Sequence, residues 1–462
     1  MNAQLRDIIV VGQGAAGLAA ALAAAQAGRG IRVTLVDKVA EDEAGGNTRW
    51  SPSYMRMASP DRVEPSFVHD MLAATKYQGD EAYFARLAKE APATVKWIAA
   101  QGVTFIQPVY YLAKGPPRIQ PEGGGPAVVK QLALAAKAAG VIFRYNCAAQ
   151  ALTSERGRVT GLVVTHDGVQ ETLQASAVIL CSGGFEGDGA AMREHFGEGA
   201  QTMRLISPGG KFNTGDGIKM AVALGAALSG DWNGMHAEPV DARAKNSAPV
   251  VLVYPYGIVV DKNGQRFFDE GYGLVHETWE WFARDMHFKA PGSIAFAILD
   301  SRLLAIQGYE RAIRSEVSPV SAGTLAELAK LIGVDADTLA ATVAVYNAAC
   351  TGDPNTFDAT RYDGLAASHT LQPPKSNWAR AIQAPPFLAY PLVGAVAYTF
   401  GGLATDASAR VLRDGLAIRG LYAAGEITGH FYATAPNAVS VLRAFVFGRI
   451  AGLEAVSFLQ GL

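Results

Sequence analysis

A strand, a glycine-rich turn and a helix follow one another between residues 8 and 27, and no other feature restricts the fold as much. The run Ile8-Ile9-Val10-Val11 is apolar at every position, which is typical of a strand covered on both faces. It leads into Gly12-Gln13-Gly14-Ala15-Ala16-Gly17. The first glycine permits a tight turn, the second lets backbone approach a pyrophosphate, and the third lets a helix pack closely on the strand. The alanine-rich run 18–27 predicts that helix, with its N-terminus facing the phosphates.

A second strand completes this pattern. Residues 33–36 are mostly apolar and end at Asp37, whose carboxylate can accept hydrogen bonds from ribose hydroxyls. A glycine turn alone is weak evidence, but the strands, the helix and the acid around this one favour a Rossmann-like α/β domain that binds an adenine dinucleotide. A solvated strand end remains the alternative for Asp37. The residues expected at the turn are Gly12, Gly14, Ala15, Ala16 and Gly17.

Composition argues against several other classes of protein. The chain has 462 residues, half of them hydrophobic, which suffices for a dinucleotide domain with a second domain attached. Its formal net charge of -2 provides no broad positive field, so nucleic acid is not an expected partner. Cys147, Cys181 and Cys350 form no CxxC pair, so no metal site, iron–sulfur cluster or attached haem is encoded. We interpret them as reduced thiols of a cytoplasmic protein.

Two apolar segments could suggest a membrane, and neither fits one. Residues 18–27 follow a strand and have no basic leader, so they predict a core-facing helix and not a signal peptide. Residues 441–459 are interrupted by Arg443, Arg449 and Glu454, which a bilayer-spanning helix would not readily tolerate. We therefore expect no membrane insertion.

Several further motifs follow in a fixed order along the chain. They include Gly45-Gly46-Asn47-Thr48-Arg49-Trp50-Ser51, Glu122-Gly123-Gly124-Gly125, Gly183-Gly184-Phe185 after an apolar run, Thr214-Gly215-Asp216-Gly217, Gly425-Glu426 after an apolar run, and Phe447-Gly448-Arg449-Ile450-Ala451-Gly452. Together they resemble the flavoprotein family of fumarate reductase and succinate dehydrogenase flavin subunits, aspartate oxidase, ketosteroid dehydrogenases and tricarballylate dehydrogenase. The resemblance implies a glutathione-reductase-like FAD-binding domain in two parts, 1–236 and 398–462, with an α+β capping domain inserted at 237–397.

The same resemblance implies where FAD would bind. The loop of Gly46, Asn47 and Thr48 would lie along the pyrophosphate and flavin, with Thr48 nearest the isoalloxazine. The other implied contacts are Lys38, Ala149, Gly183, Asp216 and Glu426, the last near the ribityl chain. Some relatives attach FAD through a histidine, but none occurs between Gly45 and Met57, so we predict non-covalent FAD.

A helix beginning near residue 438 would direct its first amides at a ligand oxygen. In the family this helix start faces the flavin pyrimidine carbonyl, so Ser440 and Val441 are the candidates for that contact. The helix could also be an ordinary amphipathic core helix, and the two interpretations are compatible. We expect Arg443, further along it, to form a surface or interdomain ion pair.

The substrate end departs from the fumarate reductase pattern. Leu274 stands where the resemblance implies a proton-donating arginine, and the substrate-clamping arginine position falls near Ala435. Tyr398 stands where those reductases have a histidine. Fumarate and similar dicarboxylates are therefore poor candidates for the substrate.

Other candidates come from related subgroups and from position. Tyr432, in Gly429-His430-Phe431-Tyr432-Ala433, resembles the ketone-holding tyrosine of ketosteroid dehydrogenases, whereas Asp269-Glu270-Gly271 looks more like tricarballylate dehydrogenase. The catalytic candidates are Tyr432, Tyr398, His236 and Tyr272. His236 and Tyr398 have a plain alternative as packed interface residues. His276, Tyr110 and Tyr111 are weaker candidates for the same cleft.

These features predict an FAD-dependent oxidoreductase that introduces or reduces a C=C bond next to a carbonyl, in a small cyclic ketone or carboxylic acid. Hydride moves at the flavin, while a protein group moves the proton on the neighbouring carbon. One alternative is a tricarballylate-like acid dehydrogenase that passes electrons to a membrane protein. Another is an electron-transfer flavoprotein without substrate chemistry. The electron acceptor or donor stays open.

Overall fold

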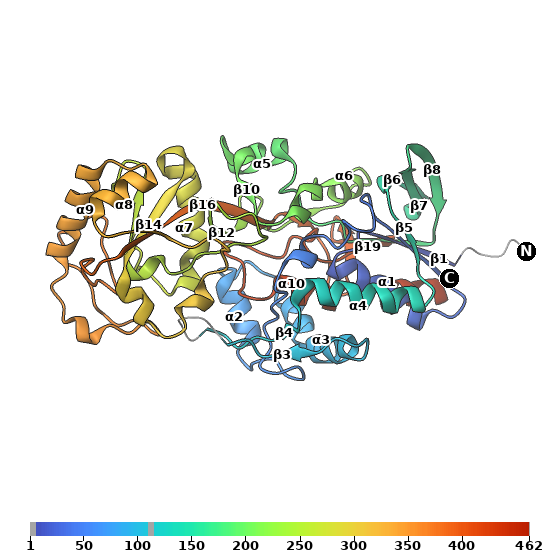
Figure 1. The fold of residues 1–462 in the computed structure, drawn as a ribbon. Coiled ribbons are helices and arrows are strands. Elements are labelled where there is room, and N and C mark those ends of the chain that lie inside the picture. The colour runs from blue at the N-terminus through green and yellow to red at the C-terminus, as the bar shows by residue number, and fades with distance from the viewer. Residues whose placement is uncertain (1–5, 110–114, 462) are drawn as a thin grey trace, which may run out of the picture.

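The computed structural model describes residues 6–109 and 115–461, which form an elongated molecule built on two large sheets (Figure 1). One sheet, with α1 (Ala15–Ala27) and α4 (Gly124–Ala138), forms one end of the molecule. The other sheet, with α8 (Leu325–Ile332) and α9 (Ala336–Ala349), forms the opposite end. No helix within the described ranges is long and apolar enough to cross a membrane.

The larger sheet has nine strands in the order β5-β2-β1-β9-β19-β7-β6, with β18 paired to β19 and β8 paired to β7. Its strands are β1 (Asp7–Val11), β2 (Arg32–Val36), β5 (Ile142–Arg144), β6 (Cys147–Glu155), β7 (Arg158–His166), β8 (Val169–Gln174), β9 (Ala177–Leu180), β18 (Arg410–Arg413) and β19 (Leu416–Ala423). β1 is buried at every residue and pairs in parallel with β2 and β9, so the predicted strands at 8–11 and 33–36 are confirmed. The carboxyl ends of these parallel strands share one edge, where α/β folds bind ligands.

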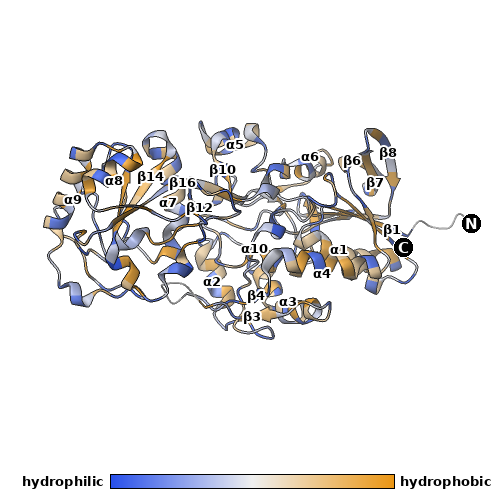
Figure 2. Ribbon diagram, viewed as in Figure 1, coloured by the Kyte–Doolittle hydropathy of each residue, from blue (hydrophilic) through white to orange (hydrophobic). Residues whose placement is uncertain are grey.

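Two helices pack against this sheet with their backbones in contact. α1 is buried from Ala15 through Ala24 and consists there of alanine, glycine and leucine, as a helix enclosed on all sides must. Figure 2 shows hydrophobic colouring on the strands of both sheets, near β1 and near β14. α1 lies against α10 (Ser440–Gln460). A Cβ on Gly448 would fall 2.3 Å from the Ala16 carbonyl oxygen, and one on Gly452 the same distance from that of Ala20. Small residues at these positions therefore permit the close approach.

The second sheet has six strands, in the order β10-β16-β14-β13, with β12 and β15 also paired to β16. They are β10 (Arg204–Leu205), β12 (Met235–Asp241), β13 (Ile258–Asp261), β14 (Ala295–Asp300), β15 (Val320–Ala322) and β16 (Phe387–Thr399). β12 and β16 run across the expected boundaries at 236/237 and 397/398, so the exact division into domains stays a prediction. Their antiparallel register puts His236 opposite Tyr398.

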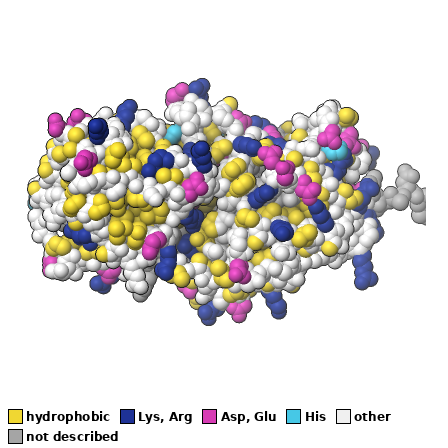
Figure 3. All heavy atoms as spheres, in the orientation of Figure 1, with side chains coloured by type: hydrophobic (Ala, Val, Ile, Leu, Met, Phe, Trp, Pro, Cys, Tyr) yellow, Lys and Arg dark blue, Asp and Glu magenta, His cyan; other side chains and the backbone are white. Residues whose placement is uncertain are grey.

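Helices and short strands cover the remaining surfaces. They are α2 (Phe67–Ala74), α3 (Glu81–Ala99), α5 (Gly189–Phe196), α6 (Asp216–Val222), α7 (Val275–Lys289), β3 (Phe105–Ile106), β4 (Gln120–Pro121), β11 (Leu228–Ser229) and β17 (Gly402–Leu403). α8 starts with a capping box in which Thr324 and Glu327 exchange side-chain and backbone hydrogen bonds. Figure 3 shows acidic and basic side chains interspersed over the visible face, as the small net charge leads one to expect.

Candidate functional site

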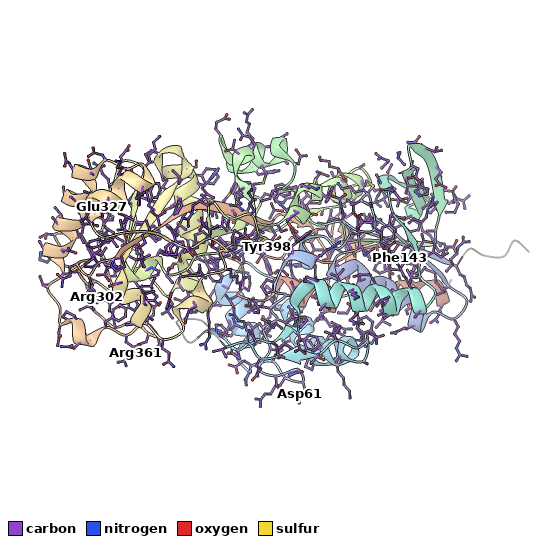
Figure 4. All side chains as sticks on the ribbon, in the orientation of Figure 1. Asp61, Phe143, Arg302, Glu327, Arg361 and Tyr398 are labelled. Carbon is purple, nitrogen blue, oxygen red and sulfur yellow. The ribbon has the colours of Figure 1, made fainter. Side chains whose placement is uncertain are left out.

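A cavity extends from the glycine turn after β1 to the six-stranded sheet, and most of the predicted site residues line it. Those residues are Gly12, Gly14, Ala15, Ala16, Asp37, Lys38, Gly46, Asn47, Thr48, Ala149, Gly183, Asp216, His236, Tyr398, Glu426, Ser440 and Val441. Tyr398 lies in the middle of the molecule, between its two ends (Figure 4). The fold therefore brings together segments that are separated by more than four hundred residues in sequence.

The three glycines of the turn meet different surroundings. Gly12 has φ +99°, and a Cβ there would lie 2.5 Å from the Cys181 carbonyl oxygen. A Cβ on Gly17 would collide with the Gly12 carbonyl oxygen at 1.8 Å, so Gly17 packs the helix on the turn and does not line the cavity. At Gly14, the N-cap of α1, the nearest atom would be Thr48 Oγ1 at 3.8 Å. The space beside Gly14 thus stays open for a ligand that approaches the backbone.

Asp37 closes the turn from the end of β2. Its carboxylate accepts hydrogen bonds from the backbone N–H groups of Gln13, at 2.8 Å, and Val39, at 3.2 Å. Burial raises the pKa of Asp37, and these backbone donors only partly oppose the rise. Beside it, Lys38 Nζ lies 2.8 Å from Asp216 Oδ2 and links β2 to the start of α6. Asp37 is therefore a structured residue at the cavity and not a solvated strand end.

The Gly45-Gly46 loop leads into a short 3-10 helix, Asn47–Trp50, that carries two predicted contacts. Thr48 Oγ1 accepts a hydrogen bond from the Ala15 N–H at 3.1 Å, which ties this loop to the start of α1. The Asn47 amide donates to Glu186 Oε1 at 2.7 Å and accepts from the Ser207 hydroxyl at 2.7 Å. These bonds hold the loop against the cavity wall.

Two acids, the buried Glu186 and the partly buried Glu426, form a close pair next to this loop. Asn213 Nδ2 donates to Glu186 at 2.7 Å and to Glu426 at 3.4 Å, and the Thr399 N–H donates to Glu426 at 3.1 Å. Burial raises the pKa of both acids, and the charge of Glu426 raises that of Glu186 further. These surroundings therefore favour the protonated form of the pair. Sequence reasoning missed Glu186, although it directly follows the Gly183-Gly184-Phe185 motif.

α10 starts at the cavity as predicted, with Ser440 and Val441 in its lining. The expected surface or interdomain ion pair of Arg443 is wrong. Its side chain is only 1% exposed, its guanidinium lies 3.9 Å from the centre of the Phe431 ring, and Nη1 donates to the Thr428 carbonyl at 3.1 Å. The side chain turns inward because this face of α10 packs against the core.

His236 and Tyr398 meet at the other end of the cavity, each from its own strand. Their rings are stacked with centroids 4.9 Å apart. His236 Nδ1 lies 2.6 Å from Glu280 Oε2 and Nε2 lies 3.3 Å from Glu238 Oε1. Burial alone would lower the pKa of His236, but these two hydrogen-bonded carboxylates raise it to about 9. Burial, reinforced by the charge of Glu280, raises the pKa of Tyr398, so its phenol keeps its proton at neutral pH.

Sequence reasoning missed both carboxylates of this group. Glu238 lies two residues after His236 on β12, a spacing that places both side chains on one face of a strand, but no strand was predicted there. Glu280 had no sequence signal, because α7 brings it from forty-four residues away. A further lining group, Tyr54, Arg118 and Arg314, was also missed.

Some sequence candidates lie elsewhere. Tyr432 is not part of the cavity lining, and its hydroxyl accepts a hydrogen bond from the Gly230 N–H at 3.0 Å. Tyr272 is also outside the lining, with 67% of its surface exposed. His276 does line the cavity. Tyr110 and Tyr111 lie outside the described residues.

The apolar, β-branched run at residues 250–260 predicts a strand from the sequence. The structure has a 3-10 turn at Tyr254–Tyr256 instead, and only Ile258–Asp261 forms a strand of the sheet. Pro255 has no N–H to donate to a ladder, which is the physical reason for the interruption.

Comparison with known proteins agrees with this geometry. A family model described as an FAD binding domain matches residues 7–438. A fumarate reductase (cytochrome) from Shewanella frigidimarina is 28% identical over 476 residues, covering 98% of this chain and 77% of that protein. A 4-oxocyclohexanecarboxylate 2-dehydrogenase from Sinomonas cyclohexanicum is 32% identical over 297 residues, covering 60% of this chain and 50% of that protein.

A solved structure, the open conformation of a flavocytochrome c3 fumarate reductase, superposes with a TM-score of 0.79 at 26% identity. The match covers 98% of this chain and 78% of that one. The expected fold and the expected FAD are confirmed by these matches. The open space beside Gly14 and the acid at the end of β2 fit the pyrophosphate and ribose of this cofactor.

Proposed function

The chain belongs to the flavoprotein family defined by this FAD binding domain, and on that premise we propose that it introduces or reduces a carbon–carbon double bond next to a carbonyl group. The substrate class that we propose is a small cyclic ketone or carboxylic acid. The observation that carries the proposal is the cavity itself. One end is lined by the dinucleotide turn, and the other by the Tyr398 phenol stacked on the His236 imidazole, which contacts Glu280 and Glu238.

The residues at the dinucleotide end would hold the cofactor, and bound FAD would supply the hydride transfer. Gly14 would let the backbone approach the pyrophosphate, while Asp37 would accept hydrogen bonds from the ribose. Asn47 and Thr48 are already fixed by hydrogen bonds to Glu186 and to the start of α1, so their loop would need little reorganisation on binding.

Tyr398 would move the proton. Its hydroxyl is protonated at neutral pH and could donate to the carbon next to the carbonyl during reduction and take the proton back in the reverse direction. Burial raises its pKa and so makes it a weaker acid, which means that the phenolate would have to be stabilised in the loaded cavity. The His236 imidazolium would hold Tyr398 in position through the stacked rings and, with Glu280 and Glu238, would keep this end of the cavity polar. The first amides of α10, at Ser440 and Val441, would favour negative charge that develops nearby.

Dye-linked oxidation and dye-linked reduction of paired saturated and α,β-unsaturated cyclic ketones and acids would test this function. We expect products that differ from their substrates by two hydrogens across a C–C bond. Tyr398→Phe should lower turnover about tenfold to a thousandfold with an unchanged FAD content. Tyr432→Phe is the matched comparison, because that tyrosine lies outside the cavity lining.

Two outcomes would count against the proposal. If Tyr398→Phe turns over like the wild type, Tyr398 does not transfer the proton. If Tyr432→Phe loses turnover instead, Tyr432 is the better candidate, as the tyrosine that holds a ketone oxygen. Electron exchange between dyes without any change in an organic substrate would indicate an electron carrier. We further propose that the electron partner is a separate molecule and that the protein works in the cytoplasm, consistent with its three free cysteines.

A further inference from the structure

Three side chains from distant segments, Tyr54, Arg118 and Arg314, form a cationic group on the cavity wall. Tyr54 and Arg118 are neighbours because Met55 and Ile119 exchange two backbone hydrogen bonds, each of 2.9 Å. Arg314 lies at the end of the molecule that holds the six-stranded sheet, and its backbone N–H donates to the Val250 carbonyl at 2.8 Å. The backbone under all three side chains is thus fixed by hydrogen bonds.

Both guanidinium groups lie against the same tyrosine. Arg118 Cζ is 3.9 Å and Arg314 Cζ is 5.4 Å from the centre of the Tyr54 ring, and Arg314 Nη2 donates to the Tyr54 hydroxyl at 3.0 Å. Within the described ranges Arg314 forms no ion pair with an acidic side chain. A guanidinium has five N–H groups, so most of those on Arg314 remain available to a ligand in the cavity.

The charges around this cationic group leave an excess of positive charge. Glu238 and Glu280 share the His236 imidazolium, so those three groups carry one negative charge together. Arg118 and Arg314 carry two positive charges, and both act on Glu238. His276 is neutral near pH 7 because burial lowers its pKa. Glu277, whose side chain is 51% exposed, adds a second negative charge to the lining, and Arg443, which also lines the cavity, adds a third positive one.

We propose that Arg314 and Arg118 bind a carboxylate group of the substrate. The substrate class is then a cyclic carbonyl compound that also bears a carboxylate, and the carbonyl and ring in this statement rest on the function proposed above. The planar fork of a guanidinium matches a carboxylate, and a single negative charge balances the excess better than a doubly charged phosphate would. This contact differs from the arginine positions implied by the family resemblance, where the chain has Leu274 and Ala435.

Binding of a ligand that cannot react separates this inference from the proposed function. The probe is cyclohexanecarboxylate, which has the ring and the carboxylate but no ring carbonyl; its neutral comparison is cyclohexanecarboxamide. Isothermal titration of the FAD-loaded enzyme should show the acid binding about tenfold to a hundredfold more tightly than the amide, as expected for charge-assisted hydrogen bonds. Arg314→Gln should abolish this preference, and Arg314→Lys should retain part of it.

Arg311→Gln is the matched control, because it removes an exposed arginine three residues away that does not line the cavity. It should keep the preference for the acid. FAD content measured for each variant shows that the protein is folded. Equal affinity for acid and amide, no binding of the acid, or an unchanged preference in Arg314→Gln would each overturn the carboxylate site. Turnover is not needed for any of these results, so a failure of the proposed function would be recognised separately in the dye-linked assay.

Discussion

Replacing Glu280 by glutamine should lower the pKa of His236 by about one to two units. In the native protein burial acts to lower that pKa, whereas hydrogen bonds and charges from Glu238 and Glu280 raise it to about 9. The Glu280 contact is the shorter of the two, 2.6 Å against 3.3 Å, and its side chain is the more buried. A glutamine oxygen can still accept a hydrogen bond but carries no charge, so it would oppose less of the lowering of the His236 pKa that burial causes.

The same pKa determines how His236 contributes to stability. A folded-state pKa of about 9 against an ordinary 6.5 corresponds to about 3 kcal/mol, at about 1.4 kcal/mol per unit, for a side chain that is 11% exposed. Because the folded-state pKa is raised, this contribution is complete below pH 6.5 and is lost as the pH rises to about 9. In Glu280→Gln the loss should still begin near pH 6.5, because the unfolded-state pKa is unchanged, but it should end at a lower pH, so the total contribution is smaller.

Histidine-selective NMR of the FAD-loaded protein would measure the pKa directly. The chain has eight histidines, and His236→Gln identifies the signal in question. Glu277→Gln is the control, since Glu277 lies on the same helix but bonds to Tyr362 and not to His236. The reasoning is refuted if His236 titrates near 6.5 in the native protein, or if Glu280→Gln leaves its pKa where it was.

Three further results are expected. Gly14→Leu should lose FAD, because a side chain would fill the open space beside the turn; full flavin occupancy, measured by absorbance, would contradict this. Heat or acid should release intact FAD into the supernatant, since no histidine lies between Gly45 and Met57, and flavin retained on the precipitated chain would show the opposite. Gly452→Val should lower the free energy of unfolding by about 1–3 kcal/mol or more, because a Cβ there would lie 2.3 Å from the Ala20 carbonyl oxygen; an unchanged melting temperature would argue against the α1–α10 contact.

The dinucleotide end could be predicted because its signals are local. The strand at 8–11, its glycine turn and the acid at 37 lie close together in sequence. The structure shows a steric reason for Gly12 and Gly17, and an open space beside Gly14. The prediction of one strand at 250–260 was wrong because the apolar, β-branched character of the run outweighed the proline within it. The predicted ion pair of Arg443 was wrong because a charged residue on a helix is usually exposed, and only the tertiary packing of α10 shows that this one is buried.

The substrate end depends on contacts between segments with no shared sequence pattern. His236 meets Tyr398 through the register of two strands more than 150 residues apart, and Glu280 reaches His236 from a helix. A resemblance between motifs compares residues only at matched positions. It therefore shows that Leu274 and Ala435 stand where arginines were expected, but it says nothing about arginines elsewhere in the chain, such as Arg118 and Arg314. A cavity can retain a positive charge while the residues that supply it change. The missing arginines therefore argue against the family's usual carboxylate contacts, but they do not argue against a carboxylate in this cavity.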